Sequence, residues 1–183
     1  MARIVANFFI SVDGVVEGPD QWHFPYFNDE MGAMVDAGMS RAAGFLMGRR
    51  MYDEWSAYWT TTDSDPEIGE RLTGTSKYVV SNSLRQADWA NTTIVTGDVE
   101  ARLREIKEQV EGDLQISGSA TTVRWLLANG LLDELNLLVH PIVVGHGQRL
   151  FEDTPTRPLK LTGSETFKTG VLHLTYVPEA TKD

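Results

Sequence analysis

Three short polar segments carry the residue types that could bind a phosphate group. Gly48-Arg49-Arg50 joins a small residue to two guanidinium groups, whose planar fork suits phosphate oxygens. Ser117-Gly118-Ser119 precedes a helical pattern, where free backbone N–H groups and the helix dipole favour an anion. Ser81-Asn82-Ser83 could hydrogen-bond a second phosphate or a ribose. The alternatives are plain ones: two solvated arginines, a strand-to-helix passage and a polar turn.

The elements that would position these segments alternate between strand and helix patterns. Short apolar runs predict strands at residues 3–10, 45–47, 77–80, 92–95, 114–116, 134–144, 159–162 and 171–177. Helical spacing and capping residues predict helices at residues 30–43, from residue 48 onward, and at 66–72, 99–110 and 120–129. This alternation predicts an α/β fold: a mostly parallel mixed sheet with helices on both faces and an antiparallel C-terminal edge. Ligands of such sheets bind at the carboxyl ends of the strands, where all three polar segments fall.

Composition narrows the class of protein. A chain of 183 residues with 42% hydrophobic and 23% charged residues suits a single folded domain over residues 1–183. The lack of cysteine excludes disulfides, cysteine-ligated metals and thiol catalysis, and the four histidines have no paired spacing for a metal. A net charge of −10 opposes binding to nucleic acid or an anionic membrane. We expect no signal peptide and no membrane span, and therefore a cytoplasmic protein.

Four motifs run along almost the whole chain. Ser11-Val12-Asp13-Gly14 follows the first strand and resembles an S-L-D-G start, and residues 46–52 resemble an M-G-R-x-T-[WY] motif. Residues 77–81 resemble the strand and phosphate turn that come next. Residues 116–151 resemble a G-G-x-x-L-x-x-x-L-L-x-x-x-L-V-D-E-L block with its P-x-x-x-G-x-G-x-x-L-F continuation. Together the motifs resemble the dihydrofolate-reductase-like superfamily, and specifically stand-alone relatives of the riboflavin-pathway pyrimidine reductase domain.

This resemblance implies a dihydrofolate-reductase-like three-layer fold and an NADPH-dependent reductase. Hydride would pass to a small heterocyclic (pyrimidine or pteridine-like) or carbonyl substrate, as in 5-amino-6-(5-phosphoribosylamino)uracil reductase. The resemblance also implies contacts with the pyrophosphate, the 2′-phosphate and the nicotinamide of NADPH. The implied contact residues are Ala6, Gly14, Gly48, Arg49, Arg50, Ser81, Asn82, Ser83, Ser117, Gly118, Ser119, Ala120 and Thr121.

The catalytic prediction is narrower. Asp13, at the end of the first strand, is the candidate to orient the nicotinamide or relay a proton, and its alternative role is to form a turn. Phe27 stands where folate reductases carry their substrate-binding acid, so Asp29 and Glu30 are the nearby acidic candidates for substrate contact. Two other functions stay open: a non-catalytic nucleotide-binding or scaffold protein, and a dihydrofolate reductase.

Self-association is a further expectation. The resemblance, together with an aliphatic run at residues 135–144, predicts a symmetric homodimer.

Overall fold

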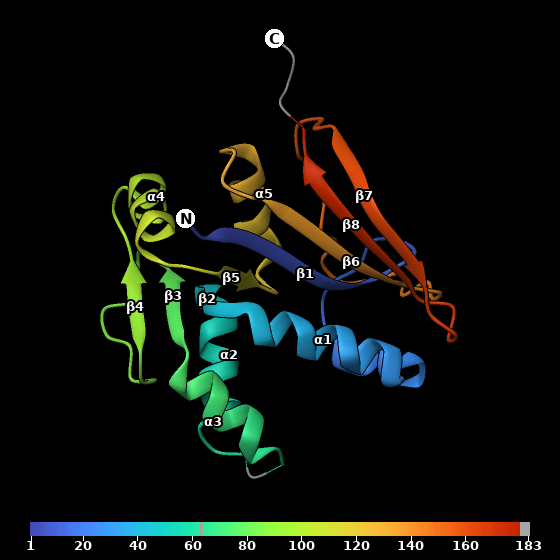
Figure 1. Ribbon diagram of the computed structural model, residues 1–183, viewed down its shortest axis with the longest axis horizontal. Coiled ribbons are helices and arrows are strands. Elements are labelled where there is room, and N and C mark those ends of the chain that lie inside the picture. The colour runs from blue at the N-terminus through green and yellow to red at the C-terminus, as the bar shows by residue number, and fades with distance from the viewer. Residues whose placement is uncertain (63, 180–183) are drawn as a thin grey trace.

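The computed structural model describes residues 1–62 and 64–179, which form an eight-stranded sheet in the order β4-β3-β2-β5-β1-β6-β8-β7 (Figure 1). The first six of these strands are parallel neighbours, and β8 and β7 form the antiparallel edge, as predicted. The strands are β1 (Arg3–Ser11), β2 (Ala42–Gly48), β3 (Ser76–Val80), β4 (Thr92–Val95), β5 (Asp113–Ile116), β6 (Glu134–His140), β7 (Leu159–Thr166) and β8 (Leu172–Pro178).

Helices cover both faces of the sheet. They are α1 (Asp29–Arg41), α2 (Arg49–Trp59), α3 (Pro66–Gly74), α4 (Val99–Gln109) and α5 (Ala120–Ala128), with single 3₁₀ turns at Pro19–Gln21 and Phe24–Tyr26. One face packs against α4 and α5, and the other packs against α1, α2 and α3. Within the described ranges, no helix is long and apolar enough to cross a membrane.

The face under α4 and α5 is uniformly apolar. Because successive side chains of a strand point to opposite faces, Ile4, Ala6 and Phe8 of β1 share this face with Leu114 and Ile116 of β5. All five are at most 5% exposed. This layer holds the main hydrophobic core.

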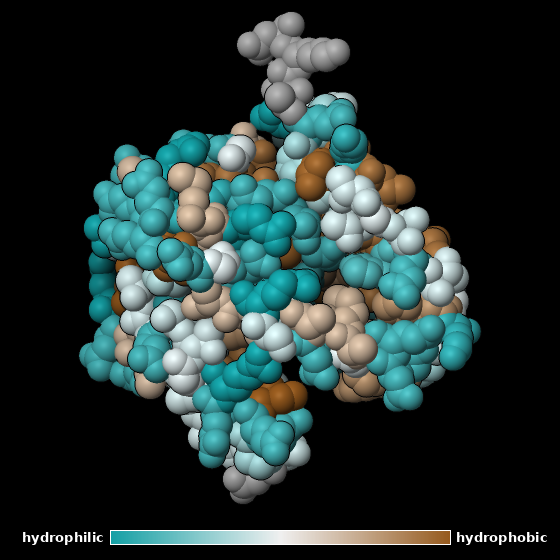
Figure 2. Space-filling model, viewed as in Figure 1, coloured by the Kyte–Doolittle hydropathy of each residue, from teal (hydrophilic) through white to brown (hydrophobic). Residues whose placement is uncertain are grey.

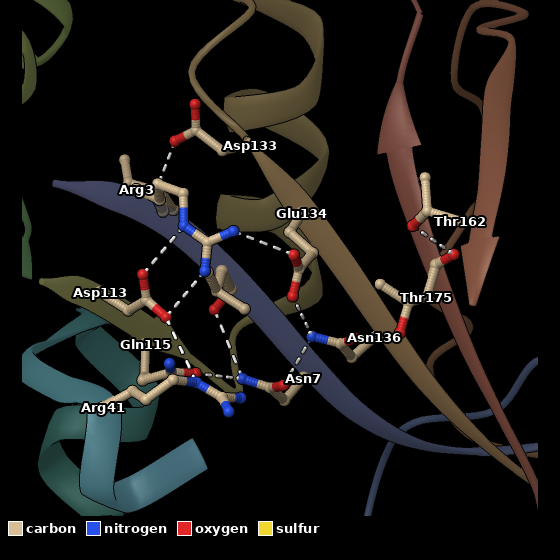
Figure 3. A network of polar contacts seen from close by, with 12 residues as sticks. Arg3, Asn7, Arg41, Asp113, Gln115, Asp133, Glu134, Asn136, Thr162 and Thr175 are labelled. Atoms are coloured by element: carbon tan, nitrogen blue, oxygen red, sulfur yellow. Dashed lines mark hydrogen bonds and ion pairs between the residues drawn. The ribbon is translucent and has the colours of Figure 1, made fainter. Parts of the chain in front are cut away.

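The opposite face mixes apolar and polar side chains. Phe45 and Met47 of β2 pack against α2 and α3, and Leu138 of β6 packs against Met31 of α1. Between these two apolar clusters, polar side chains of β1, β5 and β6 form the hydrogen-bonded network of Figure 3. A cavity remains on this face between α1 and α2.

Two element boundaries differ from the sequence prediction. The first predicted helix, at residues 30–43, ends at Arg41 because Ala42 already pairs with Asp113 of β5. The strand predicted at residues 134–144 ends at His140, because the following Pro141 has no backbone N–H to continue the ladder. Residues on both faces of β6 are buried or half-buried, and this packing accounts for much of the aliphatic run. The homodimer stays a prediction.

Candidate functional site

The three predicted phosphate segments come together at the carboxyl ends of β2, β3 and β5. Arg49, the first residue of α2, points its Nη1 at Ser83 Oγ, 3.5 Å away in the loop after β3. Gly48 lies against the start of α5, where an added β-carbon would be 2.8 Å from both Ser119 Oγ and Thr122 Oγ1. Only glycine fits this approach without displacing the α5 cap.

Two helix N-termini point into this region. Ser119 Oγ accepts the backbone N–H of Thr122 at 3.4 Å and so caps α5. The first N–H groups of an α-helix have no intrahelical partner, which leaves those of Ala120 and Thr121 available. At the start of α2, Gly48 takes the cap position, where it has no side chain to offer. Both helix ends can therefore offer N–H donors and a favourable dipole to an anion.

Arg49 and Arg50 each form an ion pair with an acidic residue of α2, and both remain exposed. Arg49 Nε donates to both carboxylate oxygens of Asp53, at 2.9 and 2.7 Å, and 42% of the Arg49 side chain is exposed. Arg50 contacts Glu54 at 3.0 Å and Glu17 at 3.4 Å, and these acids raise the pKa of Arg50 further. Each guanidinium retains N–H groups that a phosphate could accept.

The residues of the loop after β3 have two different roles. Ser81 is buried, and its Oγ accepts the backbone N–H groups of Ser83 and Leu84 at 3.2 and 3.0 Å, which closes the turn. Asn82 and Ser83 are exposed beside Arg49. Ser81 therefore shapes the loop, and its two neighbours are free to contact a ligand.

A cavity of about 870 Å³ continues from these loops between α1 and α2. In Figure 2, apolar atoms show at the notch between α1 and α3, on a face that is otherwise mostly hydrophilic. Arg50 and the start of α5 line one end, and Asn7 and Gln115 of the sheet lie on its floor. Its walls are largely aromatic or sulfur-containing and include Phe9, His23, Phe27, Met34, Met39, Phe45, Trp55 and Trp59.

Three of the predicted site residues lie away from the main cavity. Ala6 is fully buried in the core under α4 and α5, so its side chain faces away from the cavity, which Asn7 and Phe9 of the same strand line instead. Neither Asp29 nor Glu30 lines the main cavity. Glu30 accepts the backbone N–H of Lys168 at 2.8 Å, and this bond lowers the pKa of Glu30.

Asp13 and Gly14 shape the loop after β1. The Asp13 carboxylate accepts the Ser11 hydroxyl at 2.6 Å and the backbone N–H groups of Val144 and Gly145 at 3.0 and 2.8 Å. These bonds lower the pKa of Asp13 to about 2, so it is ionised at neutral pH and carries no proton to donate. Gly14 adopts a left-handed φ of 85° that a turn requires. A role for Asp13 in orienting the nicotinamide stays a prediction.

Sequence reasoning missed the cavity itself. Trp55 and Trp59 of α2 pack against the apolar cluster that contains Phe45 and Met47, and both also line the cavity wall. Asn7 and Gln115 each interrupt an apolar strand, and that interruption was the available signal for a polar floor.

Within residues 1–62 and 64–179, no group of three or more potential metal ligands occurs.

Comparison with known proteins gives consistent results. A model of the RibD C-terminal domain family matches residues 2–173. YyaP of Bacillus subtilis (strain 168), an uncharacterized protein, is 28% identical over 180 residues, 95% of this chain and 94% of YyaP. A candidate riboflavin biosynthesis protein from Shewanella sp. PV-4 has a TM-score of 0.80 at 21% identity, covering 98% of this chain and 100% of that one. Dihydrofolate reductase from Enterococcus faecalis, solved with NADP(H), has a TM-score of 0.61 at 15% identity over 97% of both chains. The dihydrofolate-reductase-like fold is confirmed.

Proposed function

The chain belongs to the RibD C-terminal domain family, and we propose that it is an NADPH-dependent reductase of a small heterocyclic or carbonyl substrate. The observation that carries this proposal is the meeting of three loops at the strand ends, beside an aromatic-lined cavity. A polyphosphate needs N–H donors and positive charge, and the cavity next to them has room for a planar ring.

Each loop has its own task in this proposal. The N–H groups of Ala120 and Thr121 bind the pyrophosphate at the α5 N-terminus. Arg49 and Arg50 bind the 2′-phosphate that distinguishes NADPH from NADH, with Asn82 and Ser83 beside them. The E. faecalis dihydrofolate reductase, which shares this fold over 97% of both chains, was solved with NADP(H), and this supports NADP(H) as the dinucleotide.

The remaining residues orient the substrate and exclude water. The bound cofactor supplies the hydride, and the protein supplies position and electrostatics. Phe45 and Leu72 are buried and contribute to the apolar wall of the cavity, which would limit the water around the reacting rings.

Titration of the protein with NADPH and NADH tests the proposal directly. We expect saturable binding with a clear preference for NADPH, followed by NADPH oxidation with one or more members of a pteridine and pyrimidine panel. Equal affinity for both dinucleotides would remove the 2′-phosphate role of the arginines, and no binding of either would refute the proposal. Binding without oxidation across the panel would favour the non-catalytic nucleotide-binding alternative.

A further inference from the structure

A chain of side-chain hydrogen bonds runs across neighbouring strands of the sheet (Figure 3) and ends at Gln115, which lines the main cavity. Asn136 Nδ2 of β6 donates to Glu134 Oε1 at 3.0 Å and to Asn7 Oδ1 of β1 at 3.2 Å. Asn7 Nδ2 in turn donates to Gln115 Oε1 of β5 at 2.5 Å. Three strands therefore contribute to one continuous polar path.

The direction of this path is determined at its far end. Glu134 pairs with the Arg3 guanidinium at 3.2 Å, and a carboxylate can only accept hydrogen bonds. Asn136 must therefore offer its amide nitrogen to Glu134, while its oxygen accepts the Thr175 hydroxyl at 2.7 Å. The same polarity passes through Asn7 to Gln115. It leaves Gln115 with its oxygen satisfied and its amide nitrogen at the end of the path.

That amide nitrogen has no hydrogen-bond partner among the described residues. Gln115 is 5% exposed, and it lines the main cavity rather than the solvent surface. Buried polar side chains almost always find a partner, so an orphan N–H group on a cavity floor calls for an explanation. A ligand acceptor is the partner that this cavity can supply.

We propose that Gln115 determines substrate specificity by donating its amide N–H to a ring carbonyl oxygen of a planar heterocycle bound in the cavity. Phe9, two residues beyond Asn7 on β1, lines the cavity wall together with Met39 of α1 and Trp55 of α2, so the walls suit a flat ring. Asn7, Asn136 and Glu134 are positioning residues, which hold the Gln115 amide in the donating orientation. The inference deepens the proposed function, because it names the class of substrate that the same site takes.

Two bicyclic probes with opposite hydrogen-bonding groups test this inference. Pteridine-2,4-dione presents carbonyl oxygens where 2,4-diaminopteridine presents amino groups. Calorimetric titration of the cofactor-free protein, repeated with saturating NADPH, gives the ratio of their affinities. We expect the wild-type protein to prefer the dione at least tenfold.

Substitutions at position 115 then separate recognition from packing. Gln115→Met keeps the length of the side chain but removes the donor, so the preference should disappear. Gln115→Glu places a carboxylate oxygen toward the cavity, so the preference should invert toward the diamino compound. Glu134→Gln removes the charge that sets the direction of the path and should reduce the preference without inverting it. Gln86→Met, at an exposed glutamine bound to Asp88, is the matched control and should leave the ratio unchanged.

The outcomes distinguish this inference from the proposed function. Equal affinity of the wild-type protein for the two probes, or no saturable binding of the dione, would overturn the inference. So would a ratio that Gln115→Met and Gln115→Glu leave unchanged in proteins with wild-type circular dichroism. If the cofactor-free protein shows the expected ratios but NADPH does not bind, the recognition site stands and the reductase proposal fails.

Discussion

Leu114 and Gln115 are neighbours on β5, yet they serve opposite faces of the sheet. Leu114 is fully buried under α4 and α5 in a layer of aliphatic side chains. Gln115 points to the other face, where a polar path ends at a cavity. The first face is closed by packing, and the second is left open between α1 and α2. Stability and ligand recognition are therefore assigned to different sides of the same strands.

Burial of the polar face costs more desolvation free energy than burial of the apolar face. Burying amides and carboxylates is costly unless each finds a hydrogen bond, and the network of Arg3, Asp113, Glu134 and Asn136 meets that demand internally. Arg3, for example, contacts both carboxylate oxygens of Asp113 at 3.0 Å. Where the network reaches the cavity, the Gln115 amide nitrogen has no hydrogen-bond partner among the described residues, and a bound ligand could supply one.

The largest expected effect comes from truncating a buried side chain on the apolar face. Leu114→Ala should lower the free energy of unfolding by about 2 to 5 kcal/mol, because it removes buried methyl groups and leaves a void. Gln115→Met, one residue away, leaves the Asn7 amide without its acceptor but opens no large void, and it should cost about 1 to 3 kcal/mol. Urea denaturation of both variants measures the contrast. Equal losses of stability would show that the apolar face does not contribute more to stability than the polar face.

The next effect falls on the cofactor loops. Arg49→Ala should weaken NADPH binding by about 1.5 to 3 kcal/mol, roughly 10- to 150-fold in Kd, because a charge-assisted bond to the 2′-phosphate is lost. NADH, which lacks that phosphate, should bind this variant about as well as it binds the wild type. Arg104→Ala is the control, since Arg104 is exposed on α4 and pairs with Glu100 on the opposite face. A parallel loss of both dinucleotides would assign Arg49 to the shared pyrophosphate instead.

Helix caps on the two faces offer a matched pair. Asn28 Oδ1 accepts the Met31 N–H at 3.0 Å at the start of α1, and Asp98 Oδ1 accepts the Ala101 N–H at 3.1 Å at the start of α4. Asn28→Ala and Asp98→Ala should each cost about 1 kcal/mol of stability. Only Asn28→Ala should also weaken binding of pteridine-2,4-dione, because α1 lines the cavity and α4 does not. Thermal melts and calorimetry measure the two effects separately.

Local signals in the sequence predicted the units that carry the phosphate loops. The glycine between a strand and a helix at Gly48, and the small residues before the helix that begins at Ala120, are features of a few neighbouring residues, and the structure places both as predicted. The polar floor could not be predicted in this way. Asn7 and Gln115 are 108 residues apart, and they meet only because β5 lies next to β1 in the sheet order.

Lys77 shows the same limit. Strand periodicity placed it correctly in β3, but a lysine in a strand is expected to reach solvent. Lys77 is instead fully buried, and its Nζ donates to the carbonyl oxygens of Leu72, Thr73 and Thr75 at the end of α3. No pattern within the strand reveals that a helix end from the preceding segment needs a cationic donor.

The smallest expected effect concerns Asp13, in the loop after β1. Hydrogen bonds from Ser11, then from Val144 and Gly145, lower its pKa from 3.8 to about 2, so the ionised carboxylate stabilises the folded state. That contribution is fully present above pH 3.8 and is lost as the pH falls from 3.8 through 2. Asp13→Asn removes it at every pH, so the difference in Tm between wild type and variant should be widest near neutrality and shrink below pH 4. Thermal melts between pH 7 and pH 2 measure this. A constant difference would mean that side-chain shape, rather than charge, holds the loop, and a tenfold fall in kcat at unchanged stability would return Asp13 to the reaction itself.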